Sequence, residues 1–367
     1  MGALIYSLPC PLRRAFLIYA ERMIDAMTAY LDNGYLDFAP IYNSTLPYWF
    51  INGARGIIGK TYGSLKYAKD HDIKIMYMRR TQAQADISSN PVFSPYKSIN
   101  RDDGCNIQMK PVSKYNSLIC ICDDEGKVEL ELGYTCALST ISNIRSFDAS
   151  DIDAVIYDEF IPEAHERPIK NEAAALFNAL ETIGRNRELY GKPPLKLIAL
   201  SNSNDVSCPI YRELGLVGIA RRMQERGTDL YQNFKKGIAL LIPHDPPLHD
   251  RKAESSLYKM TRGSDFSDMA LENEWQNNDF GLVASRPLQE YKALVHVGKL
   301  YICKHKSNGS YYCTMHPMTC KHTFSDDRIE LARFRSVYPW VYSAYMARSI
   351  TFETEQCELL LREYIRA

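Results

Sequence analysis

The stretch Asn52-Gly-Ala-Arg-Gly-Ile-Ile-Gly-Lys-Thr61 decides the fold class of this chain. An apolar, β-prone segment at residues 47–52 precedes it, and a segment that can be helical, residues 61–69, follows it. A glycine-rich turn between a strand and a helix directs backbone N–H groups at phosphate oxygens, and the helix N-terminus adds a favourable dipole. The stretch therefore predicts a phosphate-binding loop of the Walker A type.

Two side chains of this loop have predicted roles in nucleotide binding. Lys60 is expected to reach the β- and γ-phosphates of ATP, and the Thr61 hydroxyl is expected to help hold Mg²⁺. The backbone of the preceding residues would surround the phosphates. The residues predicted to bind the cofactor are Gly53, Ala54, Arg55, Gly56, Gly59, Lys60 and Thr61.

The spacing of the loop differs by one residue from the usual G-x-x-x-x-G-K-[ST] pattern. Counting back from Gly59, the first glycine position falls on Ala54, and Gly53 lies one residue too far. Ile57 or Ile58 therefore looks like an insertion. The alternative is a glycine-rich turn without a ligand, but the strand–loop–helix context favours a phosphate site.

Length and composition bound the class of protein. The 367 residues suffice for two domains with a sizeable core. With 44 basic and 44 acidic residues the chain is not a nonspecific polycation, so nucleic-acid contacts must come from local basic clusters. No apolar run approaches the about 20 residues of a membrane span. We expect a protein without a membrane segment or secretory signal, whose ten cysteines are thiols.

Apolar strands alternate with helices through the first two thirds of the chain. This pattern predicts an α/β fold with a mainly parallel sheet whose faces are covered by helices. Residues 88–116 are polar and look like a surface excursion. The predicted strands lie at 47–52, 73–78, 118–122, 128–132, 152–157, 195–200 and 238–242, with a helix over 172–187.

The pattern changes after about residue 244. A polar stretch resembles a linker or small helical module, and short strands at 291–296, 300–303 and 311–314 predict a small antiparallel sheet. Helices are expected over about 325–347 and 353–365. The predicted domains are residues 1–246, a linker at 247–285, and a C-terminal α+β domain at 286–367.

A second nucleotide signature, of the Walker B type, ends the strand at 152–157. Asp158 is expected to bind Mg²⁺, directly or through water, and Glu159 to polarise the attacking water. The alternative is an ordinary acidic strand terminus. The upstream phosphate loop and the next strand, 195–200, favour the catalytic interpretation.

Two further positions are candidate catalytic residues. Asn202, at the end of the next strand, is predicted to sense the γ-phosphate or orient the water; the alternative is a helix N-cap before Pro209. Arg185, in the run Arg185-Asn-Arg187, could be an arginine finger that reaches a neighbouring subunit's nucleotide. Its alternative is a solvated helix end, stabilised by the helix dipole.

Other basic residues leave several interpretations open. Arg55 could contact phosphate, turn toward Glu159, or pack against acceptors of its own loop. Arg79, Arg80 and Arg145 are candidates for contacts with a neighbouring subunit or with DNA phosphates, and a plain surface charge is an equal alternative for each.

The C-terminal part contains two groups of potential metal ligands. Cysteines and histidines are dense between residues 303 and 322, which suggests zinc, but their spacing matches no common zinc framework and strand alternation could bury the cysteines. Asp326 and Asp327 form an acidic pair whose alternative role is a helix N-cap.

Several segments together resemble the DNA packaging (encapsidation) ATPases of small phi-29-type podophages. The resemblance rests on the loop stretch, on Ile75-Met-Tyr-Met-Arg-Arg80, and on Ile156-Tyr-Asp-Glu-Phe-Ile161. It is most specific in Glu181-Thr-Ile-Gly-Arg-Asn-Arg-Glu188, followed by Leu200-Ser-Asn202. It covers residues 45–243 clearly and thins out after 285.

The resemblance implies an ATPase fold of the additional-strand catalytic glutamate class, a linker, and a reduced RNase H-like C-terminal domain. It implies a homomeric, pentameric ring on the procapsid portal (connector), in the host cytoplasm and transiently at the portal vertex. ATP hydrolysis there would drive double-stranded DNA into the shell. No membrane is expected as a partner. Whether a structural RNA joins the motor stays open. It also implies that Arg185 acts on the neighbouring subunit.

Two other functions remain alternatives at this point. One is an enzyme like a terminase large subunit, with an active C-terminal nuclease. The other is a non-enzymatic portal-binding protein with a degenerate loop. The absence of a convincing acidic metal-ligand set in the C-terminal part argues against the first. The second stays open, and measured ATP affinity would decide it.

Overall fold

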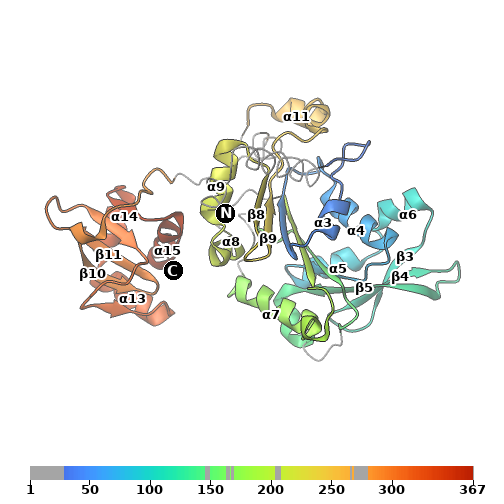
Figure 1. Cartoon of the computed structure of the whole chain (residues 1–367), viewed down its shortest axis with the longest axis horizontal. Helices are drawn as coiled ribbons and strands as arrows, with labels where there is room; N and C mark the ends of the chain where they lie inside the picture. The colour runs from blue at the N-terminus through green and yellow to red at the C-terminus, as the bar shows by residue number, and fades with distance from the viewer. Residues whose placement is uncertain are drawn as a thin grey trace, which may run out of the picture. The chain divides into compact units, whose positions relative to one another are not determined.

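The structure is a computed structural model of the chain and describes residues 29–144, 149–162, 166, 169–202, 208–264, 267 and 280–366. The chain divides into two compact units (Figure 1). The first comprises residues 1–205 and 222–276, and the second comprises 206–221 and 277–367. Most of the segment at 10–32 lies outside the described residues. The domain boundaries at 246/247 and 285/286 stay predictions.

The described part of the first unit is built on one nine-stranded sheet of order β3-β4-β5-β2-β6-β7-β1-β9-β8. The central strands from β5 to β9 pair in parallel, and β3, β4 and β8 pair antiparallel at the two edges. The predicted mainly parallel α/β fold is therefore confirmed. The strands are β1 (Tyr48–Asn52), β2 (Ile75–Arg79), β3 (Ile107–Pro111), β4 (Ser117–Cys122), β5 (Val128–Ala137), β6 (Ala154–Asp158), β7 (Lys196–Ser201), β8 (Leu230–Asn233) and β9 (Ile238–Leu241).

Helices cover the sheet because its central strands are apolar on both faces. Trp49 and Ile51 of β1 pack in one core with Leu65 of the following helix, whereas Phe50 points to the other face and contacts Phe160. Helices α3, α4 and α6 lie together on one side of the strands (Figure 1). The helices of this unit are α3 (Ala39–Asn43), α4 (Lys60–Asp70), α5 (Gln82–Ser89), α6 (Lys97–Asp103), α7 (Glu172–Gly184), α10 (His249–Ala253) and α11 (Ser256–Thr261), with 3-10 turns η1 (Leu138–Ile144) and η2 (Arg187–Tyr190).

The segment at 88–116 is more ordered than the sequence predicted. It contains α6 and β3, and the side chains of Tyr96 and Ile99 are buried in the same core as α4. Two apolar residues three positions apart are enough to bury one stripe of a short helix, although most residues around them are polar. The prediction of a surface excursion is wrong for this part.

Residues 244–264 also contribute to the first unit. Leu248 packs on the core of this unit, and Tyr258 of α11 is only 3% exposed within the same cluster as Ile57 and Ile58 of the glycine-rich loop. A buried tyrosine lies in a segment whose composition is otherwise that of a linker. One tyrosine hardly changes the average composition of the segment, so the sequence pattern did not indicate that this residue is buried.

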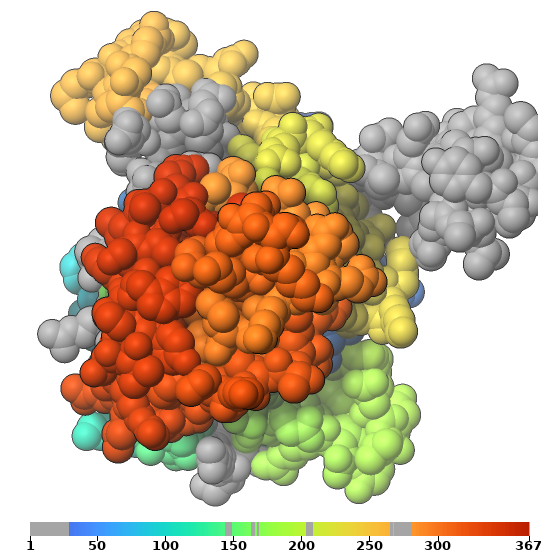
Figure 2. All heavy atoms as spheres, turned by 90° about the vertical axis from the view of Figure 1, so that its left-hand side faces the viewer, coloured from blue at the N-terminus to red at the C-terminus, as the bar shows by residue number. Residues whose placement is uncertain are grey.

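The second unit contains a small five-stranded sheet of order β13-β10-β11-β12-β14. Strands β10 to β12 form the predicted antiparallel meander, and β13 and β14 add in parallel at the two edges. Residues 280–366 form one closely packed body, drawn orange to red (Figure 2). Its strands are β10 (Tyr291–Val297), β11 (Leu300–His305), β12 (Tyr311–Thr314), β13 (Thr323–Phe324) and β14 (Ile350–Phe352), and η3 (Leu288–Glu290) precedes them. The second unit also includes α8 (Pro209–Leu214) and the start of α9 (Val217–Arg226).

The helix predicted over 325–347 is two helices. Helix α13 (Arg328–Val337) ends before Pro339, which begins α14 (Pro339–Met346). Proline lacks the N–H that a continuous helix needs and is accepted only in a first turn, so the chain breaks there. The last predicted helix is confirmed as α15 (Glu355–Arg366).

The C-terminal metal hypotheses find no support in the described part of the chain. No three His, Cys, Asp or Glu side chains there are placed to hold a metal ion. Cys303 contacts the sulfur of Met318, and the Asp327 carboxylate accepts the N–H groups of Ile329 and Glu330, which makes it the N-cap of α13. Within the same residues, no helix has the length and apolar character needed to cross a membrane.

Candidate nucleotide site

The glycine-rich loop connects β1 to α4, as predicted. Gly59 precedes the first turn of α4 with φ of 62°, in the left-handed region that favours glycine. A Cβ atom at this position would lie 2.7 Å from the ring of Tyr35. Any other residue would therefore suffer both backbone strain and a steric clash, and the loop would lose its approach to the helix N-terminus.

The apolar residues of the loop anchor it in the core. Ile57 and Ile58 are fully buried, and the Ile58 carbonyl accepts the backbone N–H of Leu36. The Ile58 side chain fills the space where a Cβ of Gly53 would stand, at 2.6 Å. Between Gly53 and Ile58 only Arg55 and Gly56 are exposed. The extra residue thus adds buried apolar contact, and the exposed rim of the loop stays short.

Lys60 lies at the base of the loop and is buried. Its Nζ donates to the Gly53 carbonyl at 2.6 Å and to Oδ1 of Asn202 at 2.7 Å. Burial lowers the pKa of Lys60 to about 8, because a charged ammonium loses solvation there. The side chain therefore connects the start of the loop with Asn202, the residue directly after β7.

Asp158, the last residue of β6, is held by three donors. The Thr61 hydroxyl donates to Oδ1 at 3.0 Å, the Tyr77 hydroxyl donates to Oδ2 at 2.7 Å, and Arg79 Nη1 lies 2.8 Å from Oδ2. The Thr61 and Asp158 oxygens meet at the start of α4. This pair combines a hydroxyl and a carboxylate, two oxygen ligands that suit Mg²⁺.

Glu159 turns away from the strand direction directly after Asp158. Its φ is 58°, a left-handed value that is uncommon for a residue with a side chain. The side-chain amide of Asn202 donates to Oε1 of Glu159, and the Asn202 backbone N–H lies 3.3 Å from Oε2. Burial raises the pKa of Glu159, and the nearby charge of Asp158 adds to the shift. The two adjacent acids therefore have different surroundings.

These side chains converge because three parallel strands end at one edge of the sheet. Strand β7 lies between β6 and β1, with Asp158 opposite Leu200 and Asn52 opposite Ser201. Ligands of open α/β sheets bind beyond the carboxyl ends of such strands. The predicted loop, Asp158, Glu159 and Asn202 are thus brought together.

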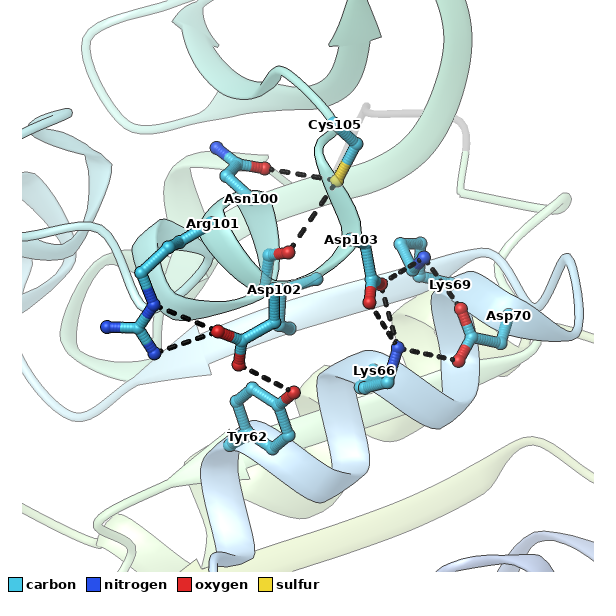
Figure 3. A network of polar contacts seen from close by, with 10 residues as sticks. Tyr62, Lys66, Lys69, Asp70, Asn100, Arg101, Asp102, Asp103 and Cys105 are labelled. Carbon is cyan, nitrogen blue, oxygen red and sulfur yellow. Dashed lines mark hydrogen bonds and ion pairs between the residues drawn. The ribbon is translucent and has the colours of Figure 1, made fainter.

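Ion pairs hold α4 against α6 (Figure 3). Lys66 and Lys69 lie 2.7 and 2.6 Å from the carboxylate of Asp103, and the Tyr62 hydroxyl donates to Asp102 at 3.0 Å. Each partly exposed pair contributes at most about 1 kcal/mol. Their shared position fixes the helix whose first turn carries Lys60.

Arg79 and Arg80 were candidates for surface contacts with a neighbouring subunit or DNA. That prediction is wrong for Arg80, which is buried, and Arg79 contacts Asp158 of its own chain. Arg80 is 0% exposed and binds Glu172 with two N–H groups, Nε at 2.7 Å and Nη2 at 3.1 Å. Sequence reasoning missed these two arginines because charged residues at a strand end usually face water. The available signal was the acidic residue that begins the helix at 172. Arg145 lies outside the described residues.

The two arginines after α7 have different environments. Arg187 donates to the Ile152 carbonyl at 2.5 Å and pairs with Asp153 at 3.0 Å, so it holds the chain against the start of β6. Arg185 directly follows the last turn of α7 with φ of 45°, and it is exposed. Of the two, Arg185 has the position of a residue that can reach another molecule.

Comparisons with known proteins point to one family. A family model described as Podovirus DNA encapsidation protein (Gp16) matches residues 40–299. The DNA packaging protein of Bacillus phage B103 is 27% identical over 244 residues, which are 65% of this chain and 67% of that protein.

Two solved structures are similar over most of the chain. The bacteriophage Phi-29 viral genome packaging motor assembly has a TM-score of 0.62 at 19% identity, covering 90% of this chain and 98% of that one. The Phi-28 gp11 DNA packaging motor has a TM-score of 0.61 at 16% identity, covering 91% and 98%. At this identity they establish a shared fold. Because the family model matches well over half of its residues, the chain belongs to the podovirus DNA encapsidation protein (Gp16) family.

Proposed function

We propose that this protein is an ATP-driven motor that moves double-stranded viral DNA into a preformed procapsid. One observation carries the proposal: Lys60, Thr61, Asp158, Glu159 and Asn202 meet at the carboxyl edge of a parallel sheet. Membership of an encapsidation family supplies the process that this chemistry would serve.

ATP and Mg²⁺ fit the residues of the site. The loop directs its backbone toward the N-terminus of α4, where anionic phosphates are favoured. Thr61 and Asp158, whose oxygens lie 3.0 Å apart, would hold the metal ion. The ion would neutralise negative charge on the phosphates of the nucleotide. Lys60 Nζ, which donates to the Gly53 and Ala54 carbonyls and to Oδ1 of Asn202, would bind phosphate oxygens.

Glu159 is the proposed general base and Asn202 its positioning partner. A base with a raised pKa is better matched to accept a proton from water near neutral pH than an ordinary carboxylate. The Asn202 amide contacts both Lys60 and Glu159, so one side chain links the phosphate-binding cation to the base. Arg185 of the neighbouring subunit would stabilise charge in the transition state.

The strand order supports the additional-strand catalytic glutamate class. Strand β7 stands between β1, which leads into the loop, and β6, which ends in the two acids. The acid that follows Asp158 is a glutamate. This arrangement is the one that gives the class its name, and it places Asn202 directly beside Lys60.

The C-terminal unit is proposed to be a reduced RNase H-like domain without nuclease activity. The antiparallel β10–β11–β12 meander with β13 parallel to β10 supports that fold, whereas β14 pairs with β12 at the other edge. Strand β10 carries no carboxylate, and Asp327 caps a helix. A binding role fits these residues better than cleavage.

The two alternatives are weaker on the same observations. An active nuclease needs clustered acidic ligands, and the described residues contain none suited to a metal after Asp327 is assigned to its cap. A degenerate loop would not keep Lys60 buried against Asn202. Clear metal-dependent nicking of plasmid DNA, lost on changing Asp326 and Asp327, would restore the nuclease alternative.

We further propose a homomeric ring, pentameric as the resemblance implies, that docks on the portal vertex from the host cytoplasm. The exposed position of Arg185 supports an active site shared between neighbouring subunits. Double-stranded DNA and the portal are the proposed partners, and a structural RNA is an additional component to be tested by its effect on assembly.

The test of this function is ATPase activity with and without DNA, with oligomer mass measured in the same sample. We expect turnover to rise with double-stranded DNA only in fractions whose mass corresponds to a ring. ATP binding that is absent at millimolar concentration would instead favour a non-enzymatic portal-binding protein.

ATP affinity is expected to fall as pH rises above about 8. Lys60 loses its proton near that pH because of burial, and phosphate anions bound at Nζ would raise its pKa again. ATP binding should therefore take up a proton at about pH 9 and almost none at about pH 6.5. Calorimetry in buffers of different ionisation enthalpy measures this uptake, and Lys60→Arg should remove it. Equal uptake in that variant would contradict the assignment.

DNA binding is expected to be insensitive to sequence and steeply sensitive to salt. The chain has 44 basic and 44 acidic residues, so binding must use local phosphate contacts rather than net charge. With about six such contacts, affinity should fall roughly 10³-fold between 50 and 200 mM salt. Anisotropy titrations with two unrelated duplexes test this prediction. A flat salt response, or strong preference for one duplex, would contradict it.

A further inference from the structure

Helix α7 is fixed at its N-terminus by a buried ion pair. Glu172, its first residue, is 1% exposed and accepts two N–H groups of Arg80 at 2.7 and 3.1 Å. The Tyr157 hydroxyl lies 3.3 Å from the same carboxylate, and Glu166 binds Arg80 Nη1 at 2.6 Å. The bidentate geometry sets both the position and the orientation of the helix start.

The opposite end of α7 is fixed by a second arginine. Arg187 reaches the backbone of Ile152 and the carboxylate of Asp153, at the beginning of β6. Between the two ends, Ala173, Leu176, Ala179 and Ile183 form the buried side of the helix. The 13 residues of the helix span about 20 Å, with Arg185 exposed at the end. The direction of α7 therefore determines where Arg185 lies.

Arg80 is also adjacent to the nucleotide site. Successive residues of a strand point to opposite faces, so Arg79 and Arg80 diverge at the end of β2. Arg79 lies 2.8 Å from Asp158, and Arg80 binds Glu172. The same two-residue stretch thus connects the proposed metal-binding carboxylate with the start of α7.

We infer that the Arg80–Glu172 pair is a positioning device that holds α7 in the direction needed to present Arg185 to the next subunit. This inference rests on the proposed function, in which Arg185 acts on a neighbour. Arg80 and Glu172 are buried within the subunit, so in this inference they act through the helix. A subunit without the pair should fail as a donor of Arg185 and remain competent as an acceptor.

The test uses a double substitution, Arg80→Met with Glu172→Met. Replacing both members of a buried ion pair by apolar residues of similar volume is often neutral for stability, so the variant should fold. A small displacement of a catalytic group can lower turnover by about 10²-fold. We expect that loss in uniform rings, with ATP affinity unchanged. If the double variant does not fold, Arg80→Lys, which keeps the charge and loses the bidentate geometry, carries the same test.

Mixed rings separate positioning from general damage. Glu159→Gln subunits lack the base and still present Arg185, so mixing them with the double variant should restore turnover. Arg79→Ala is the matched control: its change lies at Asp158, within the subunit's own site, and Glu159→Gln partners should not rescue it.

Each outcome decides the inference. Recovery with the double variant, absent with Arg79→Ala, supports it. Full activity of uniform double-variant rings overturns it, as does failure to recover when Arg185→Ala mixed with Glu159→Gln does recover. If that Arg185→Ala mixture also stays inactive, the trans role of Arg185 in the proposed function is wrong, and this inference falls with it.

Discussion

Replacing Arg185 with alanine is expected to lower the DNA-stimulated ATPase turnover of the ring by about 10³-fold or more. An arginine supplied by a neighbour neutralises charge that develops on the transferred phosphoryl group, and little else in the site can replace it. ATP affinity should change little, because the loop, Lys60 and Thr61 belong to the same subunit as the bound nucleotide. Steady-state turnover and equilibrium binding of a fluorescent ATP analogue measure the two effects.

The control for this prediction is Arg101→Ala. Arg101 is an exposed arginine of the same unit, with a side chain that is 74% accessible. Its loss should leave turnover unchanged. Rings that mix Arg185→Ala with Glu159→Gln subunits should regain part of the activity that neither variant has alone. Equal activity of Arg185→Ala and wild-type rings would show that Arg185 is only a solvated helix end.

Replacing Glu159 with glutamine is expected to lower ATP turnover by about 10²–10⁴-fold. Glutamine keeps the shape of the side chain and an oxygen for the Asn202 amide, so the backbone and the neighbouring Lys60 should stay in place. Only the ability to accept a proton is lost. Nucleotide binding should persist, and the variant should hold ATP for longer than the wild-type protein.

Single-turnover hydrolysis and ATP binding measured on the same preparation test this expectation. Glu129→Gln, an exposed glutamate on β5, is the matched control and should behave as wild type. Hydrolysis by Glu159→Gln at the wild-type rate would remove Glu159 as the base and direct attention to Asp158.

The site was predictable from sequence where its parts are local. The loop, the adjacent acids and Asn202 each follow an apolar run of β-strand length, and parallel strands end at a common edge. Burial of the strands on both faces follows from their continuous apolar composition. The convergence of these residues therefore needed only the pattern of strands and the rule about their ends.

The order of the strands was not predictable in the same way. The position of β7 between β1 and β6 results from contacts between segments about 150 residues apart along the chain. The pairing of Arg80 with Glu172 was unpredictable for the same reason, because it too is a contact between distant segments of the chain. Glu172 is 92 residues away in sequence, and no local pattern indicates that two charged residues will be buried together.

The errors in secondary structure had local causes. A periodic apolar pattern continued through Pro339, which ended one helix and began another. The polar surroundings of Tyr96 and Ile99 concealed a buried stripe. In both cases one or two residues outweighed the average composition of the segment around them.

The buried isoleucines of the loop have a consequence for recognising such proteins from genome sequences. Ile57 and Ile58 place an additional residue in the core, and the exposed rim of the loop consists of Arg55 and Gly56. Loop length can then vary between relatives if the added residue is apolar and the position of Gly53 has no side chain. A search pattern that requires a glycine, four residues and then Gly-Lys-Thr would miss this chain, because Ala54 stands where that pattern has its first glycine. A pattern that admits five residues, with an aliphatic pair before Gly-Lys-Thr, would find it.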